Sequence, residues 1–143
     1  MNKPAKILAW VAGPFLALLL VVEVADRFFI GSMCANDILA EVPSPDGAYK
    51  AIMFQRDCGA TTGFSTQVSV LRSSRALGDD ADNAFVADTD HGAAPSAPGG
   101  GPEVGIRWLS PTSLAIPRHR LARVYVAEPH VGGINVAYGP MTE

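Results

Sequence analysis

The chain has 143 residues, of which 14 are glycine and 11 are proline, and its formal net charge is −3. From residue 31 onward there are twelve acidic residues and eight lysines and arginines, a formal charge of −4. A domain that binds nucleic acid needs a basic field to neutralise phosphates, so this balance excludes a nucleic acid partner. The length leaves room for one domain beyond the first thirty residues.

The N-terminal segment predicts a membrane anchor. Residues 7–22 (ILAWVAGPFLALLLVV) carry no charge, and a helix that continues to residue 30 is long enough for the roughly 30 Å hydrocarbon core. Glu23 and Arg27 lie four residues apart, a favourable order for a helical ion pair at the outer interface. Lys3 and Lys6 precede the apolar run, so the positive-inside rule places the N-terminus in the cytoplasm. We predict residues 1–30 as cytoplasmic N-terminus and anchor and residues 31–143 as an extracytoplasmic domain, with a cleaved signal peptide as the alternative.

The two cysteines, Cys34 and Cys58, both fall in the predicted extracytoplasmic part. Two cysteines of one domain in an oxidising compartment most simply form a disulfide. Their spacing does not match a Cys-x-x-Cys redox pair, and two cysteines supply too few ligands for a metal site. The sequence therefore predicts a structural disulfide.

The extracytoplasmic part predicts short strands separated by turns. The PSPDG stretch at residues 43–47 predicts a hairpin between residues 38–42 and 49–56, and residues 66–71 alternate as a half-buried strand does. Further strands are expected at residues 83–88, 104–108, 113–116, 123–126 and 134–138, with Gly132-Gly133 as the turn between the last two. Residues 89–102 (TDHGAAPSAPGGGP) predict a long loop. The expected fold class is mainly β: a transmembrane helix followed by a small antiparallel β-sandwich or twisted sheet of about seven or eight short strands.

Two loops contain candidate binding residues. Thr61 and Thr62 lie in a small-residue stretch at residues 57–64, whose amides and hydroxyls can receive a polar ligand or a partner's main chain. The alternative is a tight connection held by the disulfide. In the second loop, Asp90 and His91 follow Asp88 and can ligate a cation or perform acid–base chemistry. The sequence shows neither further ligands nor a nucleophile at a recognisable spacing, so we expect no metal and no catalytic set.

A third candidate is the basic stretch that contains Arg118, Arg120 and Arg123. It can meet anionic lipid head groups or an acidic partner. The alternative is that these arginines are solvated and attract the acidic stretch around residues 79–90.

The stretches PSPDG, RDCGATTGF, DHG and GGGPEV follow one another at residues 43–47, 56–64, 90–92 and 99–104. With these motifs the chain resembles a family of short, uncharacterised bacterial membrane-anchored proteins with a β-rich remainder. The resemblance covers most of residues 34–138 and implies no activity. It implies that Cys34, Cys58, the CGATTGF segment and the DHG loop belong to one shared design. With the orientation predicted from Lys3 and Lys6, we expect the domain of such a bacterial protein to lie in the periplasm.

No residue set in the sequence amounts to a catalytic signature. We therefore expect a non-enzymatic, membrane-tethered periplasmic module that binds or shields a protein partner, as an accessory subunit or an immunity-type protein. Its partners would be the lipid bilayer of the inner membrane and that protein, with no cofactor. The alternative is a small-ligand binder or enzyme that uses the CGATTG and DHG loops together.

Overall fold

The computed structural model describes residues 12–25, 34–59, 62–78 and 83–141. The chain divides into two units, Met1–Met33 and Cys34–Glu143. In the first unit, residues 12–25 form a helix whose side chains are largely exposed. Among the described residues, no helix combines the length and the apolar character needed to cross a membrane. The predicted anchor, residues 1–30, lies partly outside the described residues.

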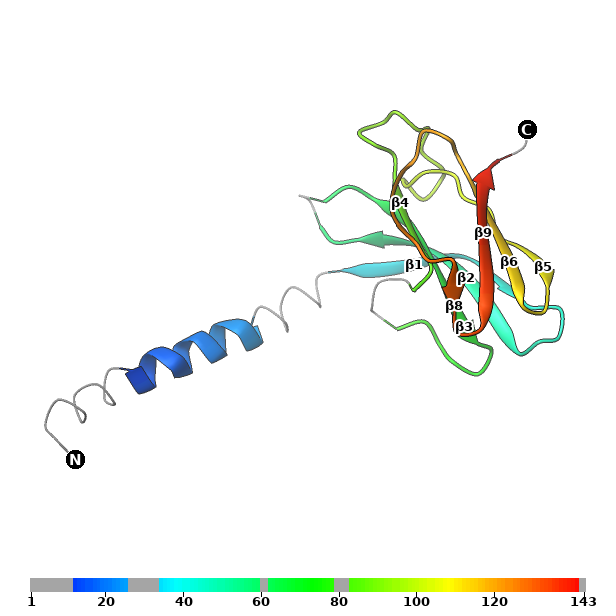
Figure 1. The fold of residues 1–143 in the computed structure, drawn as a ribbon. Helices are drawn as coiled ribbons and strands as arrows, with labels where there is room; N and C mark the ends of the chain where they lie inside the picture. The colour runs from blue at the N-terminus through cyan, green and yellow to red at the C-terminus, as the bar shows by residue number, and fades with distance from the viewer. Residues whose placement is uncertain (1–11, 26–33, 60–61, 79–82, 142–143) are drawn as a thin grey trace, which may run out of the picture. The chain divides into compact units, whose positions relative to one another are not determined.

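The second unit is mainly β, as expected, and its described part contains nine strands in two sheets (Figure 1). The five-stranded sheet has the order β1-β2-β3-β4-β7, and the four-stranded sheet has the order β5-β6-β9-β8. The strands are β1 (Ala35–Pro43), β2 (Tyr49–Asp57), β3 (Ser65–Arg72), β4 (Phe85–Asp88), β5 (Arg107–Ser110), β6 (Ser113–Arg118), β7 (Arg123–Ala127), β8 (His130–Val131) and β9 (Ile134–Pro140).

Both sheets contribute to one hydrophobic core. Its largest fully buried side chains include Val68, Phe85, Leu114, Ile116 and Ile134, which come from β3, β4, β6 and β9. The ring of Phe85 stacks on Tyr138 with 5.7 Å between ring centroids, and Trp108 Nε1 donates a hydrogen bond of 2.9 Å to the carbonyl of Val42. Burial of these apolar side chains supplies most of the stabilisation. The hydrogen bond from the Trp108 indole joins β5 to β1.

Two features of the topology differ from the expectation. Strands β6 and β9 pair in parallel, so the fold is not purely antiparallel. Gly132-Gly133 forms the turn between β8 and β9, whereas β7 pairs with β4 in the other sheet. Pro129 follows β7 and cannot donate to a strand ladder, which favours the end of the strand there and the crossing of the chain to the second sheet.

Residues 89–102 are ordered by hydrogen bonds of their own. Ala94 N–H donates to the carbonyl of Thr89 over 2.9 Å, and Ala97 N–H donates to the carbonyl of Gly101 over 2.8 Å. A Cβ on Gly101 would collide with the side chain of Thr66 and lie 2.7 Å from its backbone nitrogen. The consecutive glycines therefore let this segment pack closely on β3.

The predicted disulfide between Cys34 and Cys58 is present, with an S–S distance of 2.09 Å. It lies immediately beyond Ala35 and Asp57, the terminal residue pair between β1 and β2. The bond thus joins two adjacent strands at one end of the five-stranded sheet.

Candidate functional site

A row of polar residues crosses all five strands at this end of the sheet. Consecutive members are directly paired between neighbouring strands: Asn36 with Arg56, Arg56 with Ser65, Ser65 with Asp88, and Asp88 with Arg123. Directly opposed residues of an antiparallel pair point to the same face. The row is therefore one continuous polar strip.

The strip lies on the face of the sheet that points away from the shared core. In β4, Phe85 and Ala87 are buried in the core, and side chains alternate along a strand, so Asp88 points to the opposite face. Asn36 donates a hydrogen bond of 3.0 Å to the carbonyl of Gly78, which covers the β1 end of the strip. The β7 end, with Asp88 and Arg123, contains a cluster of polar contacts.

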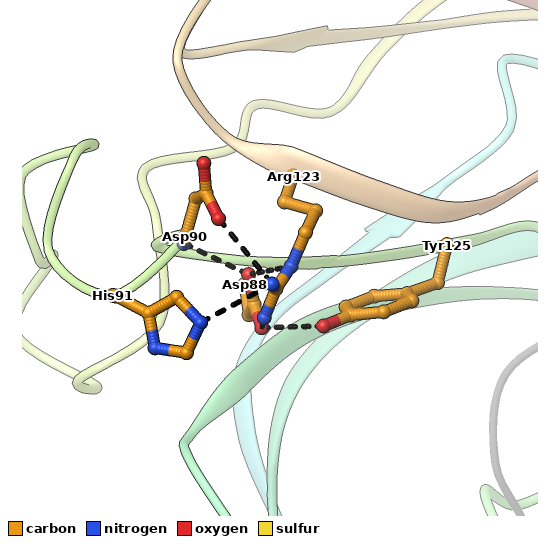
Figure 2. A network of polar contacts seen from close by, with 5 residues as sticks. All are labelled: Asp88, Asp90, His91, Arg123 and Tyr125. Carbon is orange, nitrogen blue, oxygen red and sulfur yellow. Dashed lines mark hydrogen bonds and ion pairs between the residues drawn. The ribbon is translucent and has the colours of Figure 1, made fainter.

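Asp88 is the centre of these contacts (Figure 2). Its Oδ1 accepts hydrogen bonds from the Asp90 amide at 2.8 Å and from Arg123 Nε at 3.1 Å. Its Oδ2 accepts hydrogen bonds from Arg123 Nη2 at 2.6 Å and from the Tyr125 hydroxyl at 2.7 Å. The arginine is thus bidentate, a geometry that fixes both the carboxylate and the guanidinium.

Arg123 also contacts the loop that follows β4. Its Nη1 lies 3.3 Å from Asp90 Oδ1 and 3.4 Å from His91 Nε2. Asp90 and His91 adopt positive φ angles of 48° and 55°, a region that residues other than glycine seldom occupy. The hydrogen bond from the Asp90 backbone amide to Asp88 and the ion pair between Asp90 and Arg123 hold this turn. These contacts offset the local backbone strain.

A β-bulge positions Tyr125. Val126 pairs with Val86 and Val124 pairs with Ala87, so Tyr125 is the extra residue of β7. Bulges redirect side chains and often lie next to functional sites. Here the bulge accompanies a tyrosine ring that contacts both Asp88 and Arg123, whose guanidinium carbon lies 5.2 Å from the ring centroid.

The network holds Asp88 in its charged form. Burial raises the pKa of Asp88, but hydrogen bonds from Arg123, Tyr125 and the Asp90 amide outweigh burial and lower the pKa to about 2. The same hydrogen bond to Asp88 raises the pKa of the Tyr125 phenol, because the carboxylate accepts from the neutral hydroxyl. The hydrogen bonds to Asp88 also raise the pKa of Arg123.

This arrangement is unsuited to proton transfer by Asp88. An ionised carboxylate has about four lone-pair sites, and four donors already occupy those of Asp88. A pKa of about 2 is also far from the neutral range in which a general base works best. What the network does provide is a fixed surface made of Arg123, Tyr125 and the turn at Asp90 and His91.

The structure joins two of the three features singled out in the sequence. Asp90 and His91 contact Arg123. Asp88 and Asp90 of the acidic stretch thus form ion pairs with an arginine of the basic stretch. Arg118 and Arg120 lie apart from the network, where they line a shallow cavity of about 210 Å³ with Tyr138, Gly139 and Pro140. Tyr125 was not among the predicted site residues. Its alternation with Arg123 along one strand was the available signal.

The CGATTG loop lies at the same end of the sheet as the DHG loop, because Ser65 pairs with Asp88. Thr61 lies outside the described residues. Thr62 is exposed, and both its amide and its hydroxyl donate to the carbonyl of Gly59 at 3.1 Å. This geometry is that of a local turn, and Thr62 has no polar contact with the DHG loop among the described residues.

Within the described ranges, no three histidine, cysteine or acidic side chains are placed to hold a metal ion. Comparison of the chain with models of protein families, with curated proteins and with solved structures found no match. The functional argument therefore rests on the geometry of the site.

Proposed function

We propose that the β unit, a small β-sandwich in which two sheets enclose one core, is a non-enzymatic module that binds a protein partner. We further propose that the N-terminal segment tethers it to the bacterial inner membrane, with residues 31–143 in the periplasm. The uncharged run at residues 7–22 and the preceding Lys3 and Lys6 support the tether and its orientation. The Cys34–Cys58 disulfide supports an oxidising compartment.

The observation that carries the binding proposal is an exposed aromatic ring with a fixed orientation. Tyr125 is 58% exposed, yet its hydroxyl is bonded to Asp88 and its ring packs against Arg123. A flexible surface side chain loses rotamer freedom when a partner binds, whereas a side chain that is already fixed loses little. Tyrosine and arginine are also enriched among the residues that dominate binding energy at interfaces. Tyr125 and Arg123 are therefore a pre-organised contact surface.

The alternative, a small-ligand site formed by the CGATTG and DHG loops, has weaker support. The acceptor sites of Asp88 are occupied by groups of the protein itself, and Thr62 is engaged in its own turn. A polar ligand would have to displace these bonds. A protein partner can instead pack on the exposed ring and leave the network intact.

Site-specific photocrosslinking in intact cells tests the partner surface. A crosslinking amino acid at Val126, which follows Tyr125 on β7 and is paired with Val86 on the face of Asp88, replaces no residue of the network. We expect a discrete protein adduct from this position and none from Leu109, an exposed control on β5 of the other sheet. Equal adducts at both positions, or none at Val126, would contradict the proposal.

Substitutions at Tyr125 separate the ring from its hydroxyl. Tyr125→Ala should reduce the adduct at position 126 at least tenfold, because it removes the contact surface. Tyr125→Phe should reduce the adduct less, because the ring remains and only the hydrogen bond from the hydroxyl to Asp88 is lost. The matched control Leu109→Ala should leave the adduct unchanged.

Maleimide labelling tests the compartment and orientation. We expect Cys34 and Cys58 to react with a membrane-impermeant maleimide from the periplasmic side, and only after reduction. Labelling without reduction, or only after the inner membrane is opened, would contradict the periplasmic placement.

A further inference from the structure

Two arginines that take no part in the Asp88 network line one cavity at the carboxyl ends of β6 and β9. Arg118 is the last residue of β6, and Arg120 follows it by two positions. Together with Tyr138, Gly139 and Pro140 they line a shallow cavity of about 210 Å³. Pockets for drug-sized ligands measure about 300–1,000 Å³, so this cavity suits a small polar group rather than a large ligand.

Hydrogen bonds of the main chain hold both arginine positions. Arg118 is paired with Pro140 in the parallel ladder, and its carbonyl accepts a hydrogen bond of 3.0 Å from the Met141 amide. Arg120 lies in a turn in which the Ala122 amide donates to the carbonyl two residues before Arg120's successor but one, that of residue 119, over 3.1 Å. Because the backbone is fixed at both positions, a ligand has to order only the two side chains.

The positive charge of this cavity is not neutralised within the described part of the chain. Neither of the two guanidinium groups has a hydrogen bond or an ion pair with a described residue. Arg123, the next arginine of the basic stretch, is by contrast paired with Asp88 and Asp90. Among the described residues that line the cavity, none is acidic. Two positive charges thus share one small cavity, and their field attracts an anion.

We propose that this cavity binds the phosphate group of a phosphate monoester. Guanidinium groups match phosphate oxygens in charge and in hydrogen-bond geometry. Two of them suit a group whose charge is about −1.5 to −2 at pH 7, whereas a monocarboxylate neutralises only one. Tyr138 and Pro140 supply apolar surface for the first carbon atoms of the ester. The site includes neither Tyr125 nor Arg123, so it does not depend on the protein-binding function proposed above.

Phosphorus NMR of glycerol 3-phosphate with the full-length chain in phosphatidylcholine nanodiscs tests the site, with nanodiscs lacking the protein as the blank. We expect the protein to broaden the ligand signal in a saturable manner and inorganic phosphate to compete. Glycerate, a monoanion with the same number of carbon atoms, should compete at least tenfold more weakly than inorganic phosphate. No broadening at millimolar concentration, or equal competition by glycerate and inorganic phosphate, would overturn the proposal.

Substitutions of single arginines locate the binding. Arg118→Gln and Arg120→Gln should each weaken binding of glycerol 3-phosphate about fivefold. Arg118→Lys keeps the charge but removes the planar fork, so it should weaken binding less than Arg118→Gln does. The matched control Arg107→Gln removes the same charge at an exposed arginine of β5 outside the cavity and should bind as the parent does. Unchanged binding in both cavity variants, or equal weakening by Arg107→Gln, would overturn the site.

A lipid head group and a soluble ester are the two sources of such a phosphate, and the nanodisc composition distinguishes them. Phosphatidic acid carries a phosphate monoester, whereas phosphatidylglycerol is an anionic diester that controls for surface charge. If the cavity binds the lipid, phosphatidic acid nanodiscs should abolish the broadening of glycerol 3-phosphate that phosphatidylglycerol nanodiscs retain. If the ligand is soluble, the broadening should be the same in both. Either result supports the phosphate site and identifies its source.

Discussion

Asp88→Asn removes the charge at the centre of the network and keeps the size of the side chain. The asparagine oxygen can still accept from the Asp90 amide, but its NH₂ group replaces the oxygen to which Arg123 Nη2 and the Tyr125 hydroxyl donate. The difference between a pKa of about 2 and the ordinary value of 3.8 corresponds to about 2 kcal/mol of stability. The side chains of Asp88 and Arg123 are 19% and 39% exposed, so solvent screening makes this figure an upper bound.

The pH at which this stabilisation disappears follows from the direction of the pKa change. Since the pKa of Asp88 is lower in the folded than in the unfolded chain, the stabilisation is fully present above about pH 4. It is lost as the pH falls through the folded-state pKa of about 2. Asp88→Asn should therefore be up to about 2 kcal/mol less stable than the parent at pH 7, and nearly equal to it at pH 2.

Urea unfolding followed by tryptophan fluorescence at several pH values between 2 and 7 measures this difference. At each pH, the free energy of unfolding of the variant is subtracted from that of the parent. This difference removes the contribution from protonation of the other carboxylates. Glu128→Gln, at an exposed carboxylate without a side-chain partner in the described part of the chain, should show no such pH-dependent difference. A stability difference between Asp88→Asn and the parent that stays constant from pH 7 to pH 2 would refute the argument.

Three other changes test the packing and the cross-link of the β unit. Reduction of the Cys34–Cys58 disulfide, which joins residues 24 apart in sequence, should lower the free energy of unfolding by about 3 kcal/mol in urea titrations with and without reductant. Phe85→Ala, at a fully buried ring that stacks on Tyr138, should cost about 3–5 kcal/mol in the same assay, whereas Leu109→Ala at an exposed side chain should change it little. Gly101→Ala should lower the Tm because its Cβ collides with Thr66, while Gly63→Ala, where a Cβ meets nothing within 4 Å, should not.

Strands with strong local signals could be predicted from the sequence. The PSPDG turn and the alternation around it indicated strands at residues 49–56 and 66–71, and the structure has β2 at Tyr49–Asp57 and β3 at Ser65–Arg72. Turn chemistry and side-chain alternation act over a few residues, so a single sequence is enough to predict strands from them. The parallel pairing of β6 with β9 depends on contacts between segments about twenty residues apart, which local patterns do not encode.

The candidate site was visible only in separate parts. Asp90, His91 and Arg123 were each singled out, but in two features more than thirty residues apart. What joins them is the pairing of Asp88 with Arg123, a consequence of how β4 aligns with β7. Tyr125 alternates with Arg123 in the sequence, but its contact with Asp88 is made at a bulge, and no sequence pattern here indicates the bulge.

The disulfide has a consequence for the polar strip that contains Asp88 and Arg123. Along β1, Asn36 is paired with Arg56 in the polar strip, and the next residue, Asp37, is paired with Gln55 on the opposite face. A slip of one residue between β1 and β2 would turn the side chains of the edge strand β1 to the other face, so Asn36 would leave the strip. The Cys34–Cys58 bond lies directly beyond the last pair of β1 and β2 and excludes such a slip. One cross-link thus fixes which residues the edge strand β1 presents on each face of the sheet.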